Sequence, residues 1–549
     1  MINNKRGFVK SSKSAKNLFF SGVIVLTFAN LLVKAVGLIS KIALNRVVGS
    51  IGAGYYSSAY EIYAYLYVIS TAGLPVALSI MIAKSRSKGR LLEAKKIFEI
   101  AIITFLIIGF TFASLMIVFS DELAIIIGAP ETSLSIIAIA PTMLFICISS
   151  CMRGYFQGYQ LMAPTAISQF IEALCKVGIG VTLALWAKSK GYGDHVVASY
   201  TILGVTIGVL IGMIFLYIKR LIFKEELYFD LEIPLSTEVR GVKSILKEML
   251  QIAIPITLSS SVLSLTTVLD TLMVQNRLLE YGMNEISVRI FYGDYTSLVI
   301  SMFTLPTIFL YPIANALVPL ITTAHERQNA EAENRIRSLS IRLILIIALP
   351  CAIGLGIFSK PILSLLMFKA DSVARAAPWL SIAAVSVLFL GIISITNAFL
   401  NSVGKQRLPI ISMLAGAGVK LVSNYILLAK IGIYGAPIST VLCYLVASSI
   451  NVYFVVKHVG ELPNIGKAIL KPFLCSLLAI GISAIIYYFL TQILLDKFVT
   501  IVAILLAVAC YLVLVLKTNS ITEEEILMIP NGEKLTKLLK RLKILPKNS

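Results

Sequence analysis

The feature that most constrains this chain is a series of long segments that contain almost no charged residue. Most are close to the ~20 apolar residues that an α-helix needs to cross the ~30 Å hydrocarbon core of a bilayer, and we count about fourteen of them. They are Leu18–Val33, Tyr65–Ala83, Ile97–Phe119, Ser133–Cys151, Pro164–Ala187, Val196–Ile218, Ile252–Val274, Ser297–Thr322, Leu343–Phe358, Ala376–Leu400, Leu408–Ala429, Ala436–Val456, Ala468–Ile493 and Val499–Leu516. The series predicts an all-α polytopic membrane protein with about fourteen transmembrane helices.

Composition excludes a soluble protein of this length. Hydrophobic residues make up 58% of the 549 residues and charged residues only 14%, whereas a soluble domain carries about 25% charged residues. The net charge of +20 would suit a nucleic-acid-binding protein. Here, however, the basic residues alternate between successive connecting segments, so we predict no nucleic-acid partner.

The same alternation predicts the orientation of the chain. Basic residues gather in the N-terminal leader, between 84 and 96, between 219 and 247, and after 517, while the connection near Asp121 and Glu122 has none. Placing the N-terminus in the cytoplasm puts about 33 of the Lys and Arg residues on the inner side, as the positive-inside rule requires. We therefore predict a multi-pass protein of the cell (plasma) membrane with both termini in the cytoplasm.

No motif for covalent chemistry or for a resident cofactor is present. The sequence contains no phosphate loop, no H-E-x-x-H and no G-x-S-x-G. The seven cysteines lie in apolar segments without a C-x-x-C pair, and the three histidines are scattered. We predict no metal site, no cofactor and no enzymatic activity; a coupling H⁺ or Na⁺, or the membrane potential, is the energy source that remains.

A weak internal repeat suggests two lobes. The stretch Arg153–Lys176 has an echo 244 residues later in Asn397–Lys420: each has a small polar turn, a proline and an apolar helix that reaches a lysine. Parallel repeats of this kind occur in transporters that rock two lobes around a central site. We predict an N-terminal lobe of six helices (1–235), a C-terminal lobe of six (236–460), helices 13 and 14 (461–517), and a basic amphipathic cytoplasmic tail (518–549).

Ionisable residues within the predicted spans are candidates for function, because each costs about 2.5–3.5 kcal/mol to insert and tends to face a cavity or a partner. Lys34 and Asp270 have no partner nearby in sequence, so we predict that they face a cavity. Glu172 and Lys176 share one helix face, and either mutual neutralisation or a direct role is open. Lys420 lies in the eleventh predicted helix, and Lys41 and Arg46 follow the first.

An excess of positive charge in a membrane cavity suits an anionic substrate, and a diphosphate bound by lysine point charges is the natural candidate. We predict Lys34, Lys41, Arg46 and Arg153 as substrate-binding residues. Asp270, Glu172, Lys176 and Lys420 are the predicted cavity or ion-coupling residues.

Several stretches resemble the multidrug/oligosaccharidyl-lipid/polysaccharide (MOP) exporter superfamily, and in particular its stage V sporulation protein B and lipid II flippase group. The resemblance lies in Lys34–Gly54, in Gly73–Lys84 and, most specifically, in the RG-x-FQG and PTA-x-SQ-x-x-E pattern of Arg153–Glu172. It implies two six-helix lobes in a V around a central cavity, with helices 13 and 14 forming a lipid-facing groove. Lys34 matches a basic cavity residue of that family.

The resemblance also implies a function: translocation of a lipid-linked oligosaccharide or peptidoglycan precursor, carried on undecaprenyl diphosphate, from the inner to the outer leaflet. Such a protein would serve cell-wall or spore-cortex synthesis, with membrane lipids and envelope-synthesis proteins as partners. Tyr67 or Val68, and Tyr295, stand where the family has further basic residues, which favours a sporulation-type branch or a different glycan. The alternatives are a drug/cation antiporter of the same fold and a membrane scaffold of an envelope-assembly machine.

Overall fold

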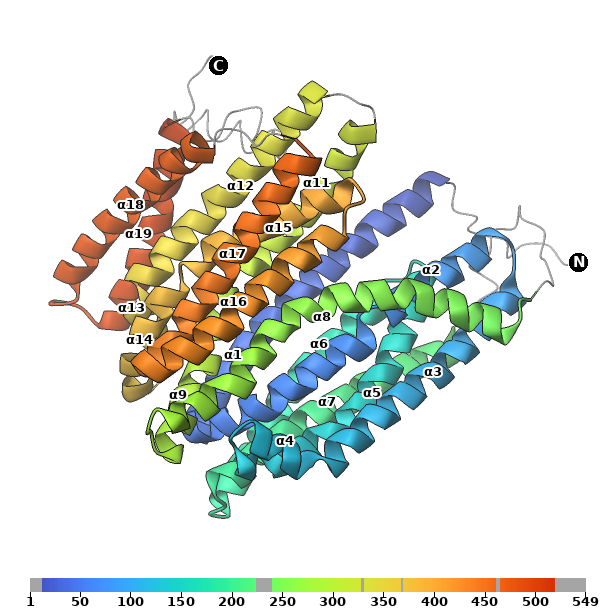
Figure 1. Cartoon of the computed structure of the whole chain (residues 1–549), viewed down its shortest axis with the longest axis horizontal. Helices are drawn as coiled ribbons and strands as arrows, with labels where there is room; N and C mark the ends of the chain where they lie inside the picture. Colours follow the sequence, from blue (N-terminus) through green and yellow to red (C-terminus); the bar gives the residue numbers. More distant parts are fainter. Residues whose placement is uncertain (1–11, 224–238, 327–329, 367–368, 461–464, 519–549) are drawn as a thin grey trace, which may run out of the picture. The chain divides into compact units, whose positions relative to one another are not determined.

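The computed structural model describes residues 12–223, 239–326, 330–366, 369–460 and 465–518, and every regular element within these ranges is helical (Figure 1). The predicted all-α fold is therefore confirmed. The chain divides into two compact units, Met1–Gln275 and Asn276–Ser549. The predicted lobe boundary at 235/236 rests on the internal repeat and stays a prediction. The predicted amphipathic face within 518–549 lies almost wholly outside the described residues.

The first unit contains eight helices and one short 3-10 turn within its described residues. They are α1 (Ser12–Thr71), α2 (Leu74–Ser87), α3 (Leu91–Val118), α4 (Ser120–Ile126), η1 (Pro130–Thr132), α5 (Ser133–Gly158), α6 (Ala163–Ser189), α7 (Asp194–Ile222) and α8, which begins at Val242 and whose last residues pass into the second unit. α1 consists of two consecutive helices, because the backbone of Gly49, with a φ of 79°, is not helical. Near this break, Lys188 of α6 donates a hydrogen bond to the Val47 carbonyl oxygen at 2.9 Å.

Glycines allow α6 and α7 to pack closely. A Cβ on Gly204 of α7 would overlap the backbone of Gly180 on α6, and a Cβ on Gly208 would lie 3.0 Å from the backbone of Glu172. Between membrane helices, small residues of this kind allow two backbones to approach closely and gain van der Waals contact. α7 also contacts α5 through buried hydroxyl pairs, Ser135 with Ser199 and Thr142 with Thr206.

Gly204→Ala is expected to destabilise the protein, because the added methyl has no space against Gly180. Overpacking of this kind costs about 1–3 kcal/mol. The midpoint of unfolding by SDS in mixed micelles measures it. Gly178→Ala on the neighbouring turn of α6 is the control, since no described atom lies within 4 Å of the position that its Cβ would take. Equal midpoints for the two variants would contradict the proposed close contact.

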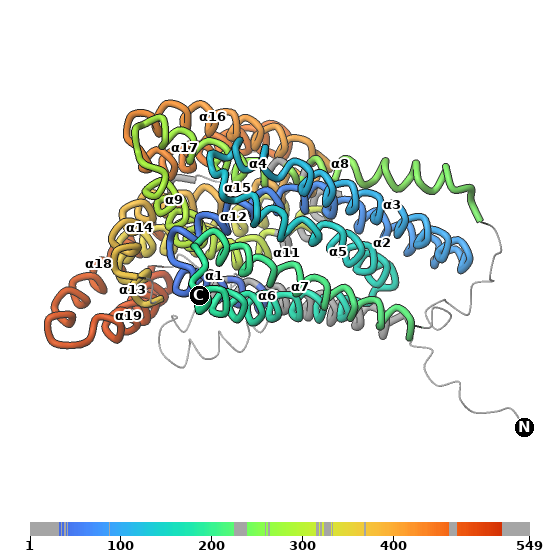
Figure 2. The backbone as a smooth tube through the Cα atoms, turned by 90° about the horizontal axis from the view of Figure 1, so that it is seen from below, coloured from blue at the N-terminus to red at the C-terminus, as the bar shows by residue number. Residues whose placement is uncertain are grey.

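The second unit begins within α8, which ends at Glu280, and contains the remaining helices. They are α9 (Glu285–Asp294), the π-helix η3 (Tyr295–Ile300), α10 (Ser301–Thr304), α11 (Thr307–Glu326), α12 (Ala330–Ile357), α13 (Ser359–Leu365), α14 (Ala370–Ala383), α15 (Ser386–Ser402), α16 (Arg407–Ile431), η4 (Gly432–Tyr434), α17 (Gly435–His458), α18 (Ile465–Leu490) and α19 (Asp496–Lys517). Figure 2 shows α18 and α19 as a pair. The pair packs on α12, where the Tyr511 hydroxyl donates to the Ile346 carbonyl oxygen at 2.7 Å.

The internal repeat reappears in the backbone. The turn between α5 and α6 places Gln160 at a φ of 61°, and the turn between α15 and α16 places Gly404 at a φ of 74°. The two residues are 244 positions apart, which is the offset that the sequence repeat shows. Gln160 is the one non-glycine residue with a positive φ among those described. Both copies therefore use the same left-handed turn to reverse the chain between two long helices.

Nine helical runs within the described residues are long and apolar enough to cross a membrane, or up to eleven if each of two bent pairs is one span. Some of these runs contain more than one helix: the run Arg407–His458 is 52 residues long and contains both α16 and α17, which pack against one another. A span of hydrocarbon needs only ~20 residues. The chain is thus a multi-pass membrane protein, and the count of fourteen stays a prediction.

Candidate functional site

A row of tyrosines follows one face of the second half of α1. Tyr56, Tyr60, Tyr63 and Tyr67 recur at steps of three or four residues, so they share a helix face. Successive ring centroids lie 5.7, 5.8 and 6.1 Å apart, and the first two rings are nearly parallel. Tyr56 and Tyr63 are buried, whereas Tyr60 and Tyr67 are half-buried. The row therefore offers aromatic faces and phenol hydroxyls to the neighbouring helix.

Lys176 of α6 meets this row. Its Nζ lies 4.2 Å from the centroid of the Tyr60 ring, within the range of a cation–π interaction. The hydroxyls of Tyr56 and Tyr60 are close enough to the ammonium group to accept hydrogen bonds from it. A lysine in an apolar span is thus held by aromatic and hydroxyl groups, with no carboxylate among the described residues as its counter-ion. Such a lysine keeps its positive charge available to an anion.

A buried ion pair lies one helical turn away. Arg153 of α5 forms an ion pair with Glu172 of α6, and its Nε donates to the Ser168 hydroxyl at 3.1 Å. The side chains are only 7% and 14% exposed. Gly212 of α7 leaves room for the carboxylate, since a Cβ there would lie 2.6 Å from Glu172 Oε1. The pair joins two helices that the turn at Gln160 separates.

The sequence left open whether Glu172 and Lys176 pair with one another. The i, i+4 spacing allows Glu172 and Lys176 to neutralise one another, but the structure gives Glu172 to Arg153 and Lys176 to the tyrosines. An arginine fork fits a carboxylate better than an ammonium does, because it donates through a fixed, planar set of N–H groups. Two cations and one carboxylate leave this cluster with a net positive charge. We call Arg153, Glu172, Lys176, Tyr56 and Tyr60 the α5–α6 cluster.

The other predicted site residues lie elsewhere. Asp270 is 2% exposed on α8 and Lys420 is 3% exposed on α16; Arg46 is exposed on the first half of α1. The side chains of Lys34 and Lys41 lie outside what the structure describes, although α1 runs through both positions. The roles of all these residues, and those of the α5–α6 cluster, stay predictions.

The second unit contains a buried ion pair that sequence reasoning did not single out. Asp294 is completely buried at the end of α9, and both Nε and a terminal nitrogen of Arg375 on α14 contact its Oδ2 at 2.8 and 2.7 Å. The π-helix η3 follows directly, and its Tyr295 hydroxyl lies 3.2 Å from that of Thr440 on α17. A π-helical turn is rare and often marks a functional position. An acidic residue directly before an apolar segment was the signal in the sequence.

A metal centre is not indicated by these side chains. Within the part of the chain that the structure describes, no three His, Cys, Asp or Glu residues lie together as ligands. What the α5–α6 cluster can do chemically is to attract and orient an anion, because its groups are hydrogen-bond donors and cations.

Comparison with known proteins identifies the family. A model of the polysaccharide biosynthesis protein family matches residues 19–325. The chain belongs to this family. A MatE family model matches residues 255–426. The predicted membership of the MOP superfamily is thereby confirmed.

Two curated relatives from Bacillus subtilis (strain 168) are similar over most of their length. The stage V sporulation protein B is 24% identical over 431 residues, which are 78% of this chain and 81% of that protein. The lipid II flippase MurJ is 24% identical over 456 residues, or 80% and 82% of the two chains. Among solved structures, a lipid II flippase MurJ in an inward closed conformation is 18% identical with a TM-score of 0.68, and covers 89% of this chain and 98% of that one. This member of the family therefore has the fold of a MurJ-like transporter.

Proposed function

We propose that this protein is a flippase that moves a lipid-linked, anionic oligosaccharide or peptidoglycan precursor from the inner to the outer leaflet. The observation that carries the proposal is the α5–α6 cluster, in which Lys176 is held by tyrosines and not by a carboxylate of the described residues. An undecaprenyl-diphosphate headgroup would supply the anion that this ammonium and Arg153 attract. The name of the relative MurJ, a lipid II flippase, supports the same substrate class.

In the proposed cycle, the headgroup enters from the cytoplasmic side while the lipid tail stays in the bilayer. Lys34, Lys41, Arg46 and Arg153 are the proposed substrate contacts. An inside-negative potential favours outward movement of negative charge by about 2.3 kcal/mol per charge per 100 mV. Asp270, Glu172 and Lys420 are the proposed positions for coupling to H⁺ or Na⁺, whereas Lys176, predicted from the sequence as a cavity or coupling residue, is proposed to attract the diphosphate. The protein would act in the plasma membrane with both termini in the cytoplasm, beside envelope-synthesis proteins.

Leaflet transfer in liposomes tests this function. Purified protein is reconstituted with a fluorescent undecaprenyl-diphosphate sugar, and the fraction that becomes accessible in the opposite leaflet is followed over time. Wild type should transfer the lipid, and Lys34→Ala should slow transfer about tenfold if one charge-assisted contact to the diphosphate is lost. Lys190→Ala is the matched control, because Lys190 is exposed beyond the end of α6. Absence of transfer with several glycans, in folded protein, would reject the flippase.

A drug/cation antiporter is the second candidate, favoured by the MatE model over residues 255–426. It predicts efflux of a cationic dye against a proton or sodium gradient and no leaflet transfer. The cationic character of the α5–α6 cluster opposes this function, because a cationic substrate would be repelled by Lys176. A membrane scaffold, the third candidate, predicts that Lys34→Ala and Asp270→Ala leave cell growth unchanged.

A further inference from the structure

The first half of α8 is packed on the core of the first unit. Ile245, Met249 and Ala253 recur at steps of four on one face and are fully or almost fully buried. They belong to the same apolar cluster as residues of α2, α3, α5 and α7, among them Leu78, Ile97 and Tyr155. The opposite face carries exposed residues such as Lys247 and Leu250. In this structure α8 is therefore seated on α2 and α3 along one apolar stripe.

The backbone directly before α2 also contacts α8, near Ala253 and Thr257. Gly73, which precedes α2, donates its backbone N–H to the Thr257 hydroxyl at 3.2 Å. A Cβ on Gly73 would overlap the carbonyl oxygen of Ala253, so only glycine permits this approach. Ala253 lies two residues before Pro255, and a proline cannot donate the helical hydrogen bond at its position. α8 therefore lacks one backbone hydrogen bond, at Pro255, close to its contact with α2.

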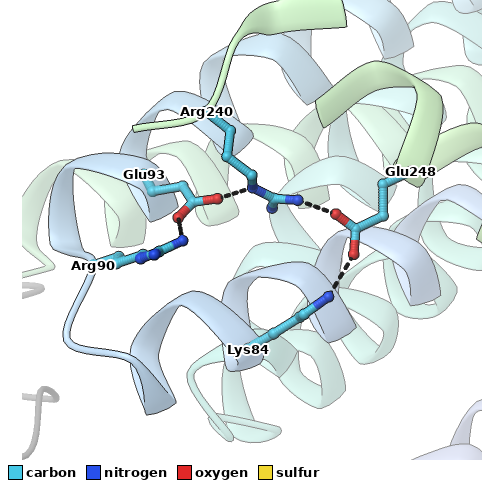
Figure 3. A network of polar contacts seen from close by, with 5 residues as sticks. All are labelled: Lys84, Arg90, Glu93, Arg240 and Glu248. Carbon is cyan, nitrogen blue, oxygen red and sulfur yellow. Dashed lines mark hydrogen bonds and ion pairs between the residues drawn. The ribbon is translucent and has the colours of Figure 1, made fainter. Parts of the chain in front are cut away.

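Five charged side chains close the same interface at the end of α2 (Figure 3). Glu248 of α8 pairs with Lys84 at 2.8 Å and with Arg240; Glu93 of α3 pairs with Arg240 and with Arg90 at 3.3 Å. Figure 3 shows Arg240 reaching between the two carboxylates, so that it joins the start of α8 to α3. Arg240 and Glu93 are 147 positions apart in the sequence, and Lys84 and Glu248 are 164 positions apart.

The electrostatics of this network favour its charged form at neutral pH. Hydrogen bonds from Lys84 and Arg240 hold the pKa of the Glu248 carboxyl below its usual value, and the hydrogen bond to Glu248 raises the pKa of Arg240. A lowered carboxyl pKa stabilises the paired state above the ordinary pKa, and that stabilisation is lost only as the pH falls through the lowered value. Glu93 is 2% exposed, whereas Glu248, Arg240 and Lys84 are 23%, 30% and 51% exposed.

We infer that these ion pairs are a latch that holds the first half of α8 on α2 and α3, and that the latch opens when α8 moves during transport. The positive-inside pattern places Lys84 and Arg90 on the cytoplasmic side. The outer members of the network are partly exposed, so water solvates them once they separate, and partly exposed ion pairs are weak enough to break repeatedly. Glu93 is buried and also pairs with Arg90, so its carboxylate stays charged and can bind Arg240 again when α8 returns. The inference rests on the proposed transport cycle.

Hydrogen exchange on the protein alone tests the latch without any substrate, so its result is independent of the leaflet-transfer assay. The probe is the exchange rate of backbone amides in peptides that cover 242–257, measured by mass spectrometry in nanodiscs. Glu248→Gln removes the carboxylate that bridges Lys84 and Arg240. It should speed exchange in 242–257 about threefold to tenfold, the range expected for two partly exposed ion pairs. Lys247→Gln, the adjacent exposed residue, should leave the rates within about twofold of wild type, since a solvated surface charge contributes little.

A salt titration separates an ionic latch from simple packing. Raising KCl to about 0.5 M should speed exchange in 242–257 of wild type toward the rate of Glu248→Gln, because salt screens partly exposed pairs. The same salt should leave Glu248→Gln unchanged. Arg240→Gln serves as a second variant and should behave like Glu248→Gln. Unchanged rates in 242–257 in both variants would overturn the latch, and so would an equal rise in peptides of α5 and α7, since that describes a general loss of fold.

Discussion

Arg153→Met is expected to destabilise the protein by about 3–5 kcal/mol, the cost of removing one partner from a buried ion pair. The substitution leaves the Glu172 carboxylate, 14% exposed, between α5 and α7 without the guanidinium that pairs with it. It also removes the donor to Ser168. The free energy of unfolding, measured by SDS titration in mixed micelles, should fall accordingly.

The double variant Arg153→Met, Glu172→Met distinguishes an ion pair from a packing contact. Replacing both members of a buried pair by apolar side chains is often neutral, so the double variant should recover most of the lost stability. Lys190→Met, which removes an exposed lysine just beyond the end of α6, is the control for losing one positive charge. If the double variant is less stable than Arg153→Met, the pair is not the source of the effect.

The elements of the fold were predictable because a membrane helix needs only local sequence. Charge-free segments such as Val196–Ile218 and Ser133–Cys151 fall inside α7 and α5. The repeat was visible for the same reason: the turns at Gln160 and Gly404 keep their spacing of 244 in sequence and in backbone conformation. The break at Gly49 and the division of the second span at Gly73 needed the structure, because a glycine in a membrane helix is usually compatible with a continuous helix.

The partners of the charged residues were not predictable in the same way. Spacing along one helix allows Glu172 to pair with Lys176, but Arg153, 19 positions earlier, is the partner that the α5–α6 packing supplies. The latch joins residues 147 and 164 positions apart, and Asp294 meets Arg375 across 81 positions. A single sequence holds no record of which distant helices are neighbours. Local periodicity therefore finds ionisable residues in spans but leaves their pairing to the tertiary structure.

Lys176→Met is expected to slow leaflet transfer of a lipid diphosphate by about tenfold to a hundredfold. A charge-assisted hydrogen bond is worth about 1.5–3 kcal/mol, and each 1.4 kcal/mol is a factor of ten. The α5–α6 cluster predicts this size of effect because tyrosines hold Lys176, whereas Arg153 is already engaged by Glu172. Methionine keeps most of the length of the side chain, so the packing against Tyr60 is largely retained. The measurement is the initial rate of transfer in the liposome assay.

Lys176→Arg is the decisive comparison, since it keeps the positive charge and a cation–π contact with Tyr60. It should retain transfer within about threefold of wild type, whereas the neutral variant should not; that difference in rate is about one kcal/mol or more. The unfolding midpoints of the two variants should differ little, because a cation–π contact contributes only about 0.5–2 kcal/mol. Equal transfer by Lys176→Met and wild type, in folded protein, would remove Lys176 from the substrate path and leave Lys34 as the cation to examine.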